Sequence, residues 1–432
     1  MAPVALRPTV VARSPALERE IHHVVRERRD QPFVELAVTL FEFTRSLHQA
    51  ARRCGVDQLA FLAREGRILH DAFDRYQRVV EADDAVATGY LYVSRRSTFL
   101  PSLRPVADED FARILELYPT ITTAGLLRSM GLDGDGADEV LAEVTGGRDG
   151  PLDLDALKRN RPFRCRYEHQ RIEQQRLLVR YLEQVTGSST DPLHVVDVGW
   201  KGTMQDHLQA LLGPERVVEG YYLGLVPTKG LRHGERKHGL LFDTRDGGTP
   251  HHRVFRHFKS LYELLLQADH GSVQSYRDVA GTVEPVLDTQ PVEARVFRDV
   301  IGPVQEGVLE AFDALCQVAA AHAPLPDLGR LAARHHARML YFPTAAEIDV
   351  VCRLEHFENF GQMEFVSAAV AGPRGGRQRA VAIAGVARDP RRLLGRTWPP
   401  LELRALGLSP LIPVVGAYRW VRELYLPTPG RS

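Results

Sequence analysis

One short stretch of the chain, residues 194–208, constrains its fold more than any other. An apolar strand ends in Asp197, a turn with two glycines follows, and a helix is predicted to begin at Thr203. Glycines let the backbone turn tightly and expose its N–H groups, and the N-terminus of a helix carries partial positive charge. Anion sites of α/β proteins are built in this order. The stretch therefore predicts a phosphate site at the edge of a parallel sheet.

The turn supplies most of the candidate ligand-binding residues. Lys201 adds a positive charge, and Asp197 stands where open α/β sheets place ligands, so it could hold a sugar hydroxyl or a Mg²⁺ ion. Trp200 could stack on a base or sugar ring, or it could plug the edge of the core. The alternative for the whole turn is a strand-to-helix connection that binds nothing. The candidate phosphate-binding residues of the turn are Gly199, Trp200, Lys201, Gly202 and Thr203.

Composition limits the classes of partner and site. The chain of 432 residues is 44% hydrophobic and 25% charged, as is ordinary for a globular protein. Its 55 basic and 55 acidic residues give no reason to expect nucleic acid or an anionic membrane as the default partner, so partners must be argued from local sites. Its four cysteines lack the paired spacing of zinc sites. Neither a membrane helix nor a secretory signal is evident, so a cytoplasmic location is expected.

Strands and helices alternate along much of the chain. A helix is expected over residues 33–54, where apolar residues recur at helical spacing, and further helices are expected over 68–80 and 203–212. Strands with intervening helices predict a parallel, Rossmann-like sheet. The expected strands are residues 58–63, residues 89–94, a short run ending at Asp197, and residues 218–226.

The remaining segments differ in character from this core. Residues 107–186 look entirely helical, with glycines between short helices, and predict an inserted helical lobe. A helix over 263–271 should lead into a further strand, and helices are expected over 292–321 and 328–340. The predicted division is an N-terminal extension (1–32), an α/β core (33–106 and 187–290), an inserted helical lobe (107–186), and a mostly helical C-terminal region (291–432). The C-terminal region ends in an irregular tail rich in Arg, Gly and Pro, notably over residues 372–379 and 388–400.

Charged residues follow three of the predicted strands. Parallel strands end at one edge of a sheet, so these residues should converge there with Asp197. Arg64 and one of Arg95 or Arg96 could clamp phosphate oxygens, while Asp197 or Glu65 could bind metal or act as a base. The alternative for each arginine is a surface charge or an ion pair. Arg64 and Glu65 follow the first strand, and Arg95 and Arg96 follow the second.

Histidines offer one further candidate for acid–base chemistry. His270 lies at a predicted helix-to-strand junction, where it could exchange protons or could serve as a structural cap. The candidate catalytic residues are therefore Asp197, Glu65 and His270. A group of nearby histidines resembles a metal set, but the proline and arginines around it favour an exposed loop. These histidines are His251, His252 and His257.

Five motifs occur in an order that resembles one known module. They are Phe61-Leu-Ala-Arg-Glu-Gly66, Tyr90-Leu-Tyr-Val-Ser-Arg-Arg96 with Leu100-Pro-Ser-Leu103, Val196-Asp-Val-Gly-Trp-Lys-Gly-Thr203, Gly220-Tyr-Tyr-Leu-Gly224 and His270-Gly-Ser272. Over residues 30–290 the chain resembles the module usually fused to haloacid-dehalogenase-like hydrolase domains and glycosyltransferases in bacterial surface-polysaccharide gene sets. The resemblance implies a role in polysaccharide or glycoconjugate biosynthesis.

The chain departs from that module in two ways. The usual Arg-Asp-Gly is Arg64-Glu65-Gly66 here, which keeps the charge and lengthens the reach of the carboxylate. No Asp-x-Asp follows an N-terminal apolar strand, so the accompanying hydrolase domain is expected to be missing, and Asp197-Val198-Gly199 lacks the second carboxylate of such phosphatases. The layout also resembles that of phosphoribosyltransferases, although Val196 stands where they carry a second acidic residue.

Three functional hypotheses follow from different classes. The first is a transferase that uses a phosphorylated or nucleotide-activated sugar, with phosphate held by the turn from Asp197 to Thr203 and with Mg²⁺ as its cofactor if one is needed. The second is a haloacid-dehalogenase-like hydrolase acting on a phosphorylated substrate. The third is a non-catalytic partner that binds a sugar or nucleotide beside separate glycosyltransferase or hydrolase chains.

Overall fold

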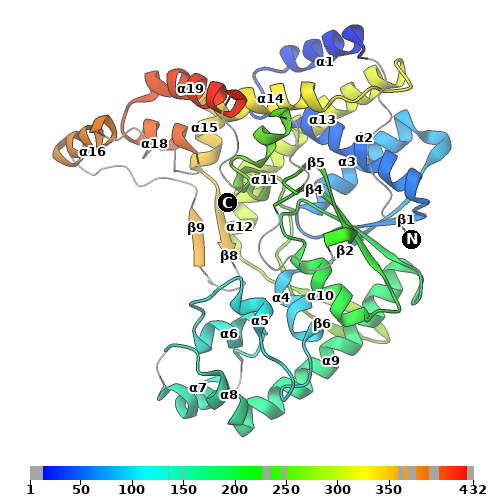
Figure 1. The fold of residues 1–432 in the computed structure, drawn as a ribbon, viewed down its shortest axis with the longest axis vertical. Coiled ribbons are helices and arrows are strands. Elements are labelled where there is room, and N and C mark those ends of the chain that lie inside the picture. Colours follow the sequence, from blue (N-terminus) through cyan, green and yellow to red (C-terminus); the bar gives the residue numbers. More distant parts are fainter. Residues whose placement is uncertain are drawn as a thin grey trace.

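A five-stranded parallel sheet forms the centre of the protein (Figure 1). The structure is a computed structural model that describes residues 13–134, 136–147, 150–226, 234–245, 250–358, 364–367, 376–388 and 398–425. The strand order is β2-β1-β3-β4-β5. The strands are β1 (Gln58–Leu62), β2 (Ala87–Leu91), β3 (Leu193–Asp197), β4 (Val218–Leu225) and β5 (Lys237–Asp243). The predicted α/β class with a parallel sheet is therefore confirmed.

Both faces of the sheet are covered by helices. Along β1, Leu59 and Phe61 join one hydrophobic cluster, whereas Leu62 joins another, because successive side chains of a strand point to opposite faces. Burial on both faces explains why the central strands are short, nearly continuous apolar runs. The first face is covered by α2 (Leu36–Cys54), α3 (Gly66–Val80) and α13 (Gly302–Ala320), and the second by α9 (Arg161–Thr186) and α10 (Thr203–Leu212).

The second strand ends earlier than the sequence predicts. A strand was expected over residues 89–94, but β2 ends at Leu91. Ser94 instead caps the short helix α4 (Arg95–Phe99), and its Oγ accepts a 3.0 Å hydrogen bond from the backbone N–H of Ser97. The backbone N–H of Ser94 in turn donates a 2.9 Å hydrogen bond to the hydroxyl oxygen of Ser97, which completes a capping box. This closed cap turns the chain away from the sheet.

Other expected elements are also corrected by the structure. The helix expected over 263–271 is α11 (Ser260–Leu265), and the expected short strand after it is one half of an antiparallel hairpin, β6 (Val273–Val279) and β7 (Thr282–Leu287). The helix expected over 292–321 is divided into α12 (Pro291–Val296), a π-helical turn and α13. Strand β5 was not expected at all.

Residues 99–167, which we call the lobe, have a hydrophobic cluster of their own between β2 and β3. The 26-residue helix α9 belongs to both parts, because Phe163 and Tyr167 lie in the lobe cluster while Leu177 and Leu182 pack on the sheet. In Figure 1 the lobe lies below the sheet, with α9 running between them. Its short helices are α5 (Ala112–Leu115), α6 (Thr123–Ser129), α7 (Ala137–Thr145) and α8 (Leu154–Arg159).

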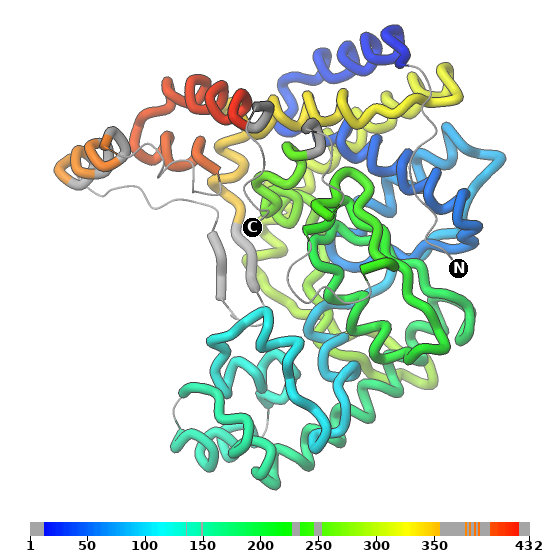
Figure 2. The backbone as a smooth tube through the Cα atoms, in the orientation of Figure 1, coloured from blue at the N-terminus to red at the C-terminus, as the bar shows by residue number. Residues whose placement is uncertain are grey.

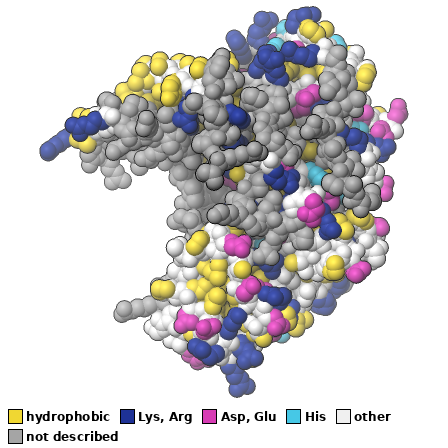
Figure 3. Space-filling view, in the orientation of Figure 1, with side chains coloured by type: hydrophobic (Ala, Val, Ile, Leu, Met, Phe, Trp, Pro, Cys, Tyr) yellow, Lys and Arg dark blue, Asp and Glu magenta, His cyan; other side chains and the backbone are white. Residues whose placement is uncertain are grey.

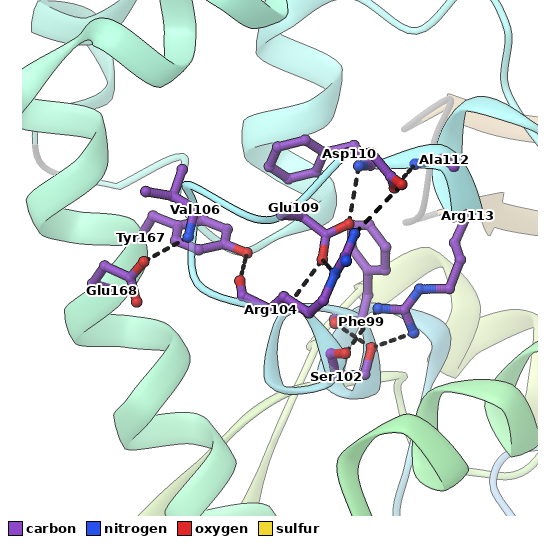
Figure 4. A network of polar contacts seen from close by, with 11 residues as sticks. Phe99, Ser102, Arg104, Val106, Glu109, Asp110, Ala112, Arg113, Tyr167 and Glu168 are labelled. Carbon is purple, nitrogen blue, oxygen red and sulfur yellow. Dashed lines mark hydrogen bonds and ion pairs between the residues drawn. The ribbon is translucent and has the colours of Figure 1, made fainter. Parts of the chain in front are cut away.

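A polar network holds the first loop of the lobe (Figure 4). The buried carboxylate of Glu109 accepts hydrogen bonds of 2.9 Å from the backbone N–H groups of Arg104 and Phe111. Tyr167, on α9, donates a 2.6 Å hydrogen bond to the carbonyl of Arg104. Arg113 donates to the hydroxyl and the carbonyl of Ser102 at 3.0 and 2.8 Å. The loop is thus fixed to α9 and to the start of the lobe by buried polar contacts.

Helices of the C-terminal region complete the structure. Figure 2 shows α1 (Pro15–Glu27) beside α13, although the two are almost 300 residues apart. Two predicted irregular stretches, 372–379 and 388–400, fall partly outside the described residues, but α16 occupies part of the first. No helix in the described ranges is long and apolar enough to cross a membrane. The remaining elements are α14 (Gly329–Tyr341), α15 (Ala345–Cys352), β8 (Glu355–Glu358), β9 (Glu364–Ser367), α16 (Gly376–Arg388), α18 (Pro399–Ala405) and α19 (Ile412–Tyr425).

Candidate functional site

The chain reverses its direction of winding between β1 and β3. Strand β1 lies between β2 and β3, and the helices that follow β1 and β3 pack on opposite faces of the sheet. Open α/β sheets bind ligands at the carboxyl ends of strands where the order reverses in this way. The loops at this place are residues 63–65 after β1 and 198–202 after β3. The structure therefore puts Arg64, Glu65 and the turn after Asp197 at neighbouring strand ends.

Asp197 is a buried carboxyl group at the end of β3. Its side chain is almost inaccessible to solvent, with 6% of the residue exposed, and its Oδ1 accepts a 2.8 Å hydrogen bond from the N–H of Val198. Burial raises the pKa of Asp197 well above its usual range, and the nearby Glu65 carboxyl raises it further, whereas the Val198 N–H and Arg95 act in the opposite direction. Three predicted residues from three strand ends thus interact: Asp197, Glu65 and Arg95.

The two turn glycines make room for strand β4. Gly199 has φ 129°, and a Cβ there would lie 2.2 Å from the carbonyl oxygen of Gly224. Gly202 has φ 67°, and a Cβ there would lie 2.7 Å from the hydroxyl oxygen of Tyr222. The turn also continues the pairing with β4, because the N–H of Val226 donates to the carbonyl of Trp200 at 2.8 Å. Both glycines are therefore required by the protein's own packing.

The main-chain N–H groups of the turn have no acceptor among the described residues. None of the N–H groups from Gly199 to Thr203 donates a hydrogen bond to another residue that the structure describes. Helix α10 begins at Thr203, and no described side chain caps it. N–H groups without an acceptor at the start of a helix are donors in fixed positions, and the partial positive charge of the helix N-terminus adds to their attraction for an anion. The turn therefore has the donor pattern of an anion site.

Two lysines lie beside these donors. Lys201 is exposed, and Lys259 lies with its Nζ 5.5 Å from the centre of the Trp200 ring. Burial lowers the pKa of Lys259, Glu263 raises it, and the positive charges of Lys201 and Arg256 lower it. Mutual influence of this kind requires the cations to lie near one another. An anion at the turn would relieve their repulsion.

Trp200 plugs the edge of the core, which was one of the two alternatives for it. Its ring packs against Phe242 and Tyr262, with ring centres 5.7 Å away in both cases. Its indole N–H donates a 3.0 Å hydrogen bond to the Glu263 carboxylate. With these neighbours the indole is anchored in the protein, and its role at the turn is to hold the loop against β5 and α11.

The arginines of the site already have partners. Arg64 forms a 2.8 Å ion pair with Glu293 of α12, and both side chains are about nine-tenths buried. Arg96 pairs with Asp133 of the lobe at 3.0 Å, so it reaches toward the lobe. Arg95 donates a 3.2 Å hydrogen bond to the hydroxyl of Tyr118, also in the lobe, while its charge acts on Asp197. The ion-pair alternative thus applies to Arg64 and Arg96.

His270 is held in one tautomer by two hydrogen bonds. Its Nδ1 lies 2.8 Å from the carbonyl oxygen of Gly271, to which it must donate, so its Nε2 accepts from the Tyr90 hydroxyl at 2.7 Å. Burial lowers the pKa of His270, which keeps the ring neutral. The backbone contact fits the structural role, whereas burial raises the pKa of Tyr90, which opposes proton exchange through the tyrosine. Sequence reasoning left both open, and both contacts are present.

Four residues of the site escaped sequence reasoning. Tyr90 lies in β2, and its partner His270, 180 residues away, could not be inferred. Glu293 is separated from Arg64 by 229 residues, and Lys259 follows a segment without a clear pattern. Lys237 lies in the unexpected strand β5, and its ammonium group donates to the carbonyl of Lys201 at 3.0 Å. Only the charge of the two lysines was a signal in the sequence.

The histidines that resemble a metal set belong to no metal-binding group among the described residues. Within the described ranges, no group of three or more His, Cys, Asp and Glu residues is arranged to hold a metal ion. His257 lies with its Nδ1 2.7 Å from the Tyr341 hydroxyl, whereas the side chains of His251 and His252 lie outside the described residues.

No protein-family model matches the chain, and no curated protein sequence matches it significantly.

Proposed function

We propose that the protein is a transferase that binds a phosphorylated or nucleotide-activated sugar between the ends of β1 and β3. The run of N–H groups from Gly199 to Thr203 that donate to no other described residue, at the start of α10 and beside buried Asp197, is the observation that carries this proposal. The strand order supports it, since a Rossmann-like, doubly wound sheet places phosphates at this point. In this proposal, residues 99–167 are an insertion that closes one side of the site.

Each part of the site has a chemical task in the proposed reaction. The phosphate oxygens accept hydrogen bonds from the turn, and Lys201 and Lys259 neutralise the charge that develops on the leaving phosphate or diphosphate. Asp197, with its raised pKa, is suited to exchange a proton with the acceptor hydroxyl. If Mg²⁺ is bound instead, Asp197 would lose its proton and, with Glu65, would hold the ion, which would neutralise charge on the phosphate.

The family resemblance supports a place in surface-polysaccharide or glycoconjugate biosynthesis. A phosphatase of the haloacid-dehalogenase kind is less well supported, because the turn after Asp197 carries no second carboxylate. A non-catalytic sugar- or nucleotide-binding partner remains the alternative that the paired arginines favour, since Arg64 and Arg96 are already neutralised within the protein.

Ligand binding is tested by a thermal-shift screen. The purified protein is heated with nucleotide sugars, sugar phosphates, phosphoribosyl pyrophosphate and free nucleotides, each with and without Mg²⁺. A ligand at about 100 times its Kd adds about 2.7 kcal/mol of stability, which moves the Tm measurably. Lys201→Ala should remove the shift, whereas the matched variant Lys158→Ala, on α8 of the lobe, should retain it. Equal shifts in both variants would place the ligand elsewhere.

Turnover distinguishes the three functions. The ligand that shifts the Tm is incubated with the protein and followed by ³¹P NMR, first alone and then with candidate sugar or lipid-alcohol acceptors. Release of nucleoside diphosphate or pyrophosphate that depends on an acceptor supports the transferase. Release of inorganic phosphate without an acceptor supports the hydrolase. Binding without turnover under all conditions supports the non-catalytic partner.

A further inference from the structure

Helix α19 exposes a stripe of large apolar side chains. Leu411 precedes the helix and is 45% exposed, and within the helix Val414, Tyr418 and Val421 are 64%, 57% and 52% exposed. Positions three and four apart lie on one side of a helix, so these residues form one continuous stripe. We call these four residues the apolar stripe.

The opposite side of α19 is docked against α14. Ile412 is buried, and a Cβ on Gly416 would lie 1.9 Å from the carbonyl oxygen of Tyr341. This close approach fixes the rotation of the helix, which directs the apolar stripe away from the protein. Trp420, at the flank, packs edge-on against Phe342 with ring centres 6.0 Å apart and is still 42% exposed. Figure 3 shows apolar side chains gathered over this end of the molecule.

The chain segment that contains the apolar stripe is basic in sequence. Residues 371–425 contain ten arginines, no lysine and three acidic residues, a net charge of +7 in a chain whose total charge is zero. Arg377 and Arg388 on α16 are exposed, and Figure 3 shows basic side chains at the tip where α16 lies. The charge is therefore concentrated in the same part of the chain as the exposed apolar side chains.

We infer that the apolar stripe of α19 binds the surface of an anionic lipid bilayer. Interfacial helices combine an apolar face carrying aromatic residues with arginines that attract acidic headgroups, and α19 has such a face within a basic segment of the chain. Tyrosine and tryptophan are suited to the boundary between headgroups and acyl chains. A second copy of the chain is disfavoured as the occupant, because pairing would bring together two segments with the same excess of positive charge. This surface is separate from the proposed sugar site and does not depend on it.

Vesicle sedimentation tests the inference with the full-length protein. Vesicles of phosphatidylcholine and phosphatidylglycerol in equal amounts should bind the protein, and vesicles of pure phosphatidylcholine should bind it at least about tenfold more weakly. The double variant Val414→Asp/Val421→Asp should bind the anionic vesicles about tenfold more weakly than the wild type. Ile172→Asp is the matched control, because Ile172 on α9 is 57% exposed and lies outside the apolar stripe. Circular dichroism establishes that each variant is folded.

Tryptophan fluorescence gives a second, local measurement. The chain has three tryptophans, and of these Trp398 is buried and Trp200 is anchored at the sheet edge, so Trp420 should report contact with lipid. Its emission should shift to shorter wavelength with anionic vesicles, and Trp420→Phe should remove the shift. The inference is overturned if anionic vesicles do not bind, or if the stripe variant and Ile172→Asp bind equally. It is also overturned if the stripe variant dissociates a dimer of the free protein.

Discussion

Lys237 and Asp206 form an ion pair against the turn that joins β3 to α10. The Nζ of Lys237 lies 2.7 Å from Oδ1 of Asp206, and the lysine side chain is completely buried. The same ammonium donates to the carbonyl of Lys201 at 3.0 Å, and a Cβ on Gly202 would lie 2.9 Å from Cε of Lys237. A charge inside the protein therefore supports the turn that carries the candidate donor N–H groups.

Replacing this lysine should destabilise the protein and distort the turn. Lys237→Met should lower the free energy of unfolding by about 3 kcal/mol, because Asp206 loses its buried ammonium partner. Urea unfolding measures the loss, and the thermal-shift screen should show weaker ligand binding. The double variant Lys237→Met/Asp206→Asn should recover part of the stability, since it leaves no uncompensated carboxylate at this pair. Unchanged stability in Lys237→Met would mean that the ion pair contributes nothing.

Asp197→Asn should stabilise the free protein and remove its ligand binding. Because the folded-state pKa of Asp197 lies above its unfolded value, the wild type loses stability as pH rises from about 4 through the folded pKa. The amide cannot ionise, so the Tm of the variant should exceed that of the wild type at pH 8 by on the order of 2 °C, with little difference at pH 4. Thermal melts at both pH values measure this. A variant that is less stable at pH 8 would indicate an ionised, well-paired carboxylate.

Glu293 should compete with the ligand for Arg64. In the structure this carboxylate neutralises Arg64 at 2.8 Å, so Glu293→Gln should leave the arginine more available to a phosphate and should tighten binding several-fold. Arg64→Met should have the opposite effect on affinity. Calorimetric titration with the ligand identified by the screen measures both. If the two variants change affinity in the same direction, Arg64 has a structural role and does not contact the ligand.

His336 should make the protein sensitive to acid. This histidine is completely buried and stacked on Tyr262, and burial lowers its pKa to about 3. The neutral ring stabilises the folded state fully above pH 6.5, and this stability is lost as pH falls from about 6.5 toward 3, by at most about 1.4 kcal/mol per pH unit. His336→Gln should reduce the slope of stability against pH by about one proton. An unchanged slope in His336→Gln would contradict this prediction.

Much of the central sheet follows from local sequence. Strands β1, β3 and β4 are short apolar runs buried on both faces, and Gly55 ends α2 in the left-handed conformation that its position predicts. Strand β5 escapes prediction because it begins with Lys237 and His238, and the partner that neutralises Lys237 lies 31 residues away. The turn glycines were expected to favour a ligand, whereas their neighbours on β4 require them as well.

The candidate site was harder to predict than the fold. Its members at the strand ends follow from the rule that parallel strands end at one edge, and Asp197, Glu65 and Arg95 do interact there. The partners of Arg64, Arg95 and Arg96 come from α12 and the lobe, and no local pattern in the sequence indicates such long-range pairs. The unpaired donors of the turn are likewise visible only when every main-chain hydrogen bond is known.

Helix α9 connects the two hydrophobic cores that share it. A helix of 26 residues is about 39 Å long, and one end is anchored in the lobe while the other is anchored on the sheet. A ligand that draws Arg95 away from Tyr118 would loosen a second tie between these bodies. A ligand at the edge of the sheet would then change how firmly the lobe is held to the sheet.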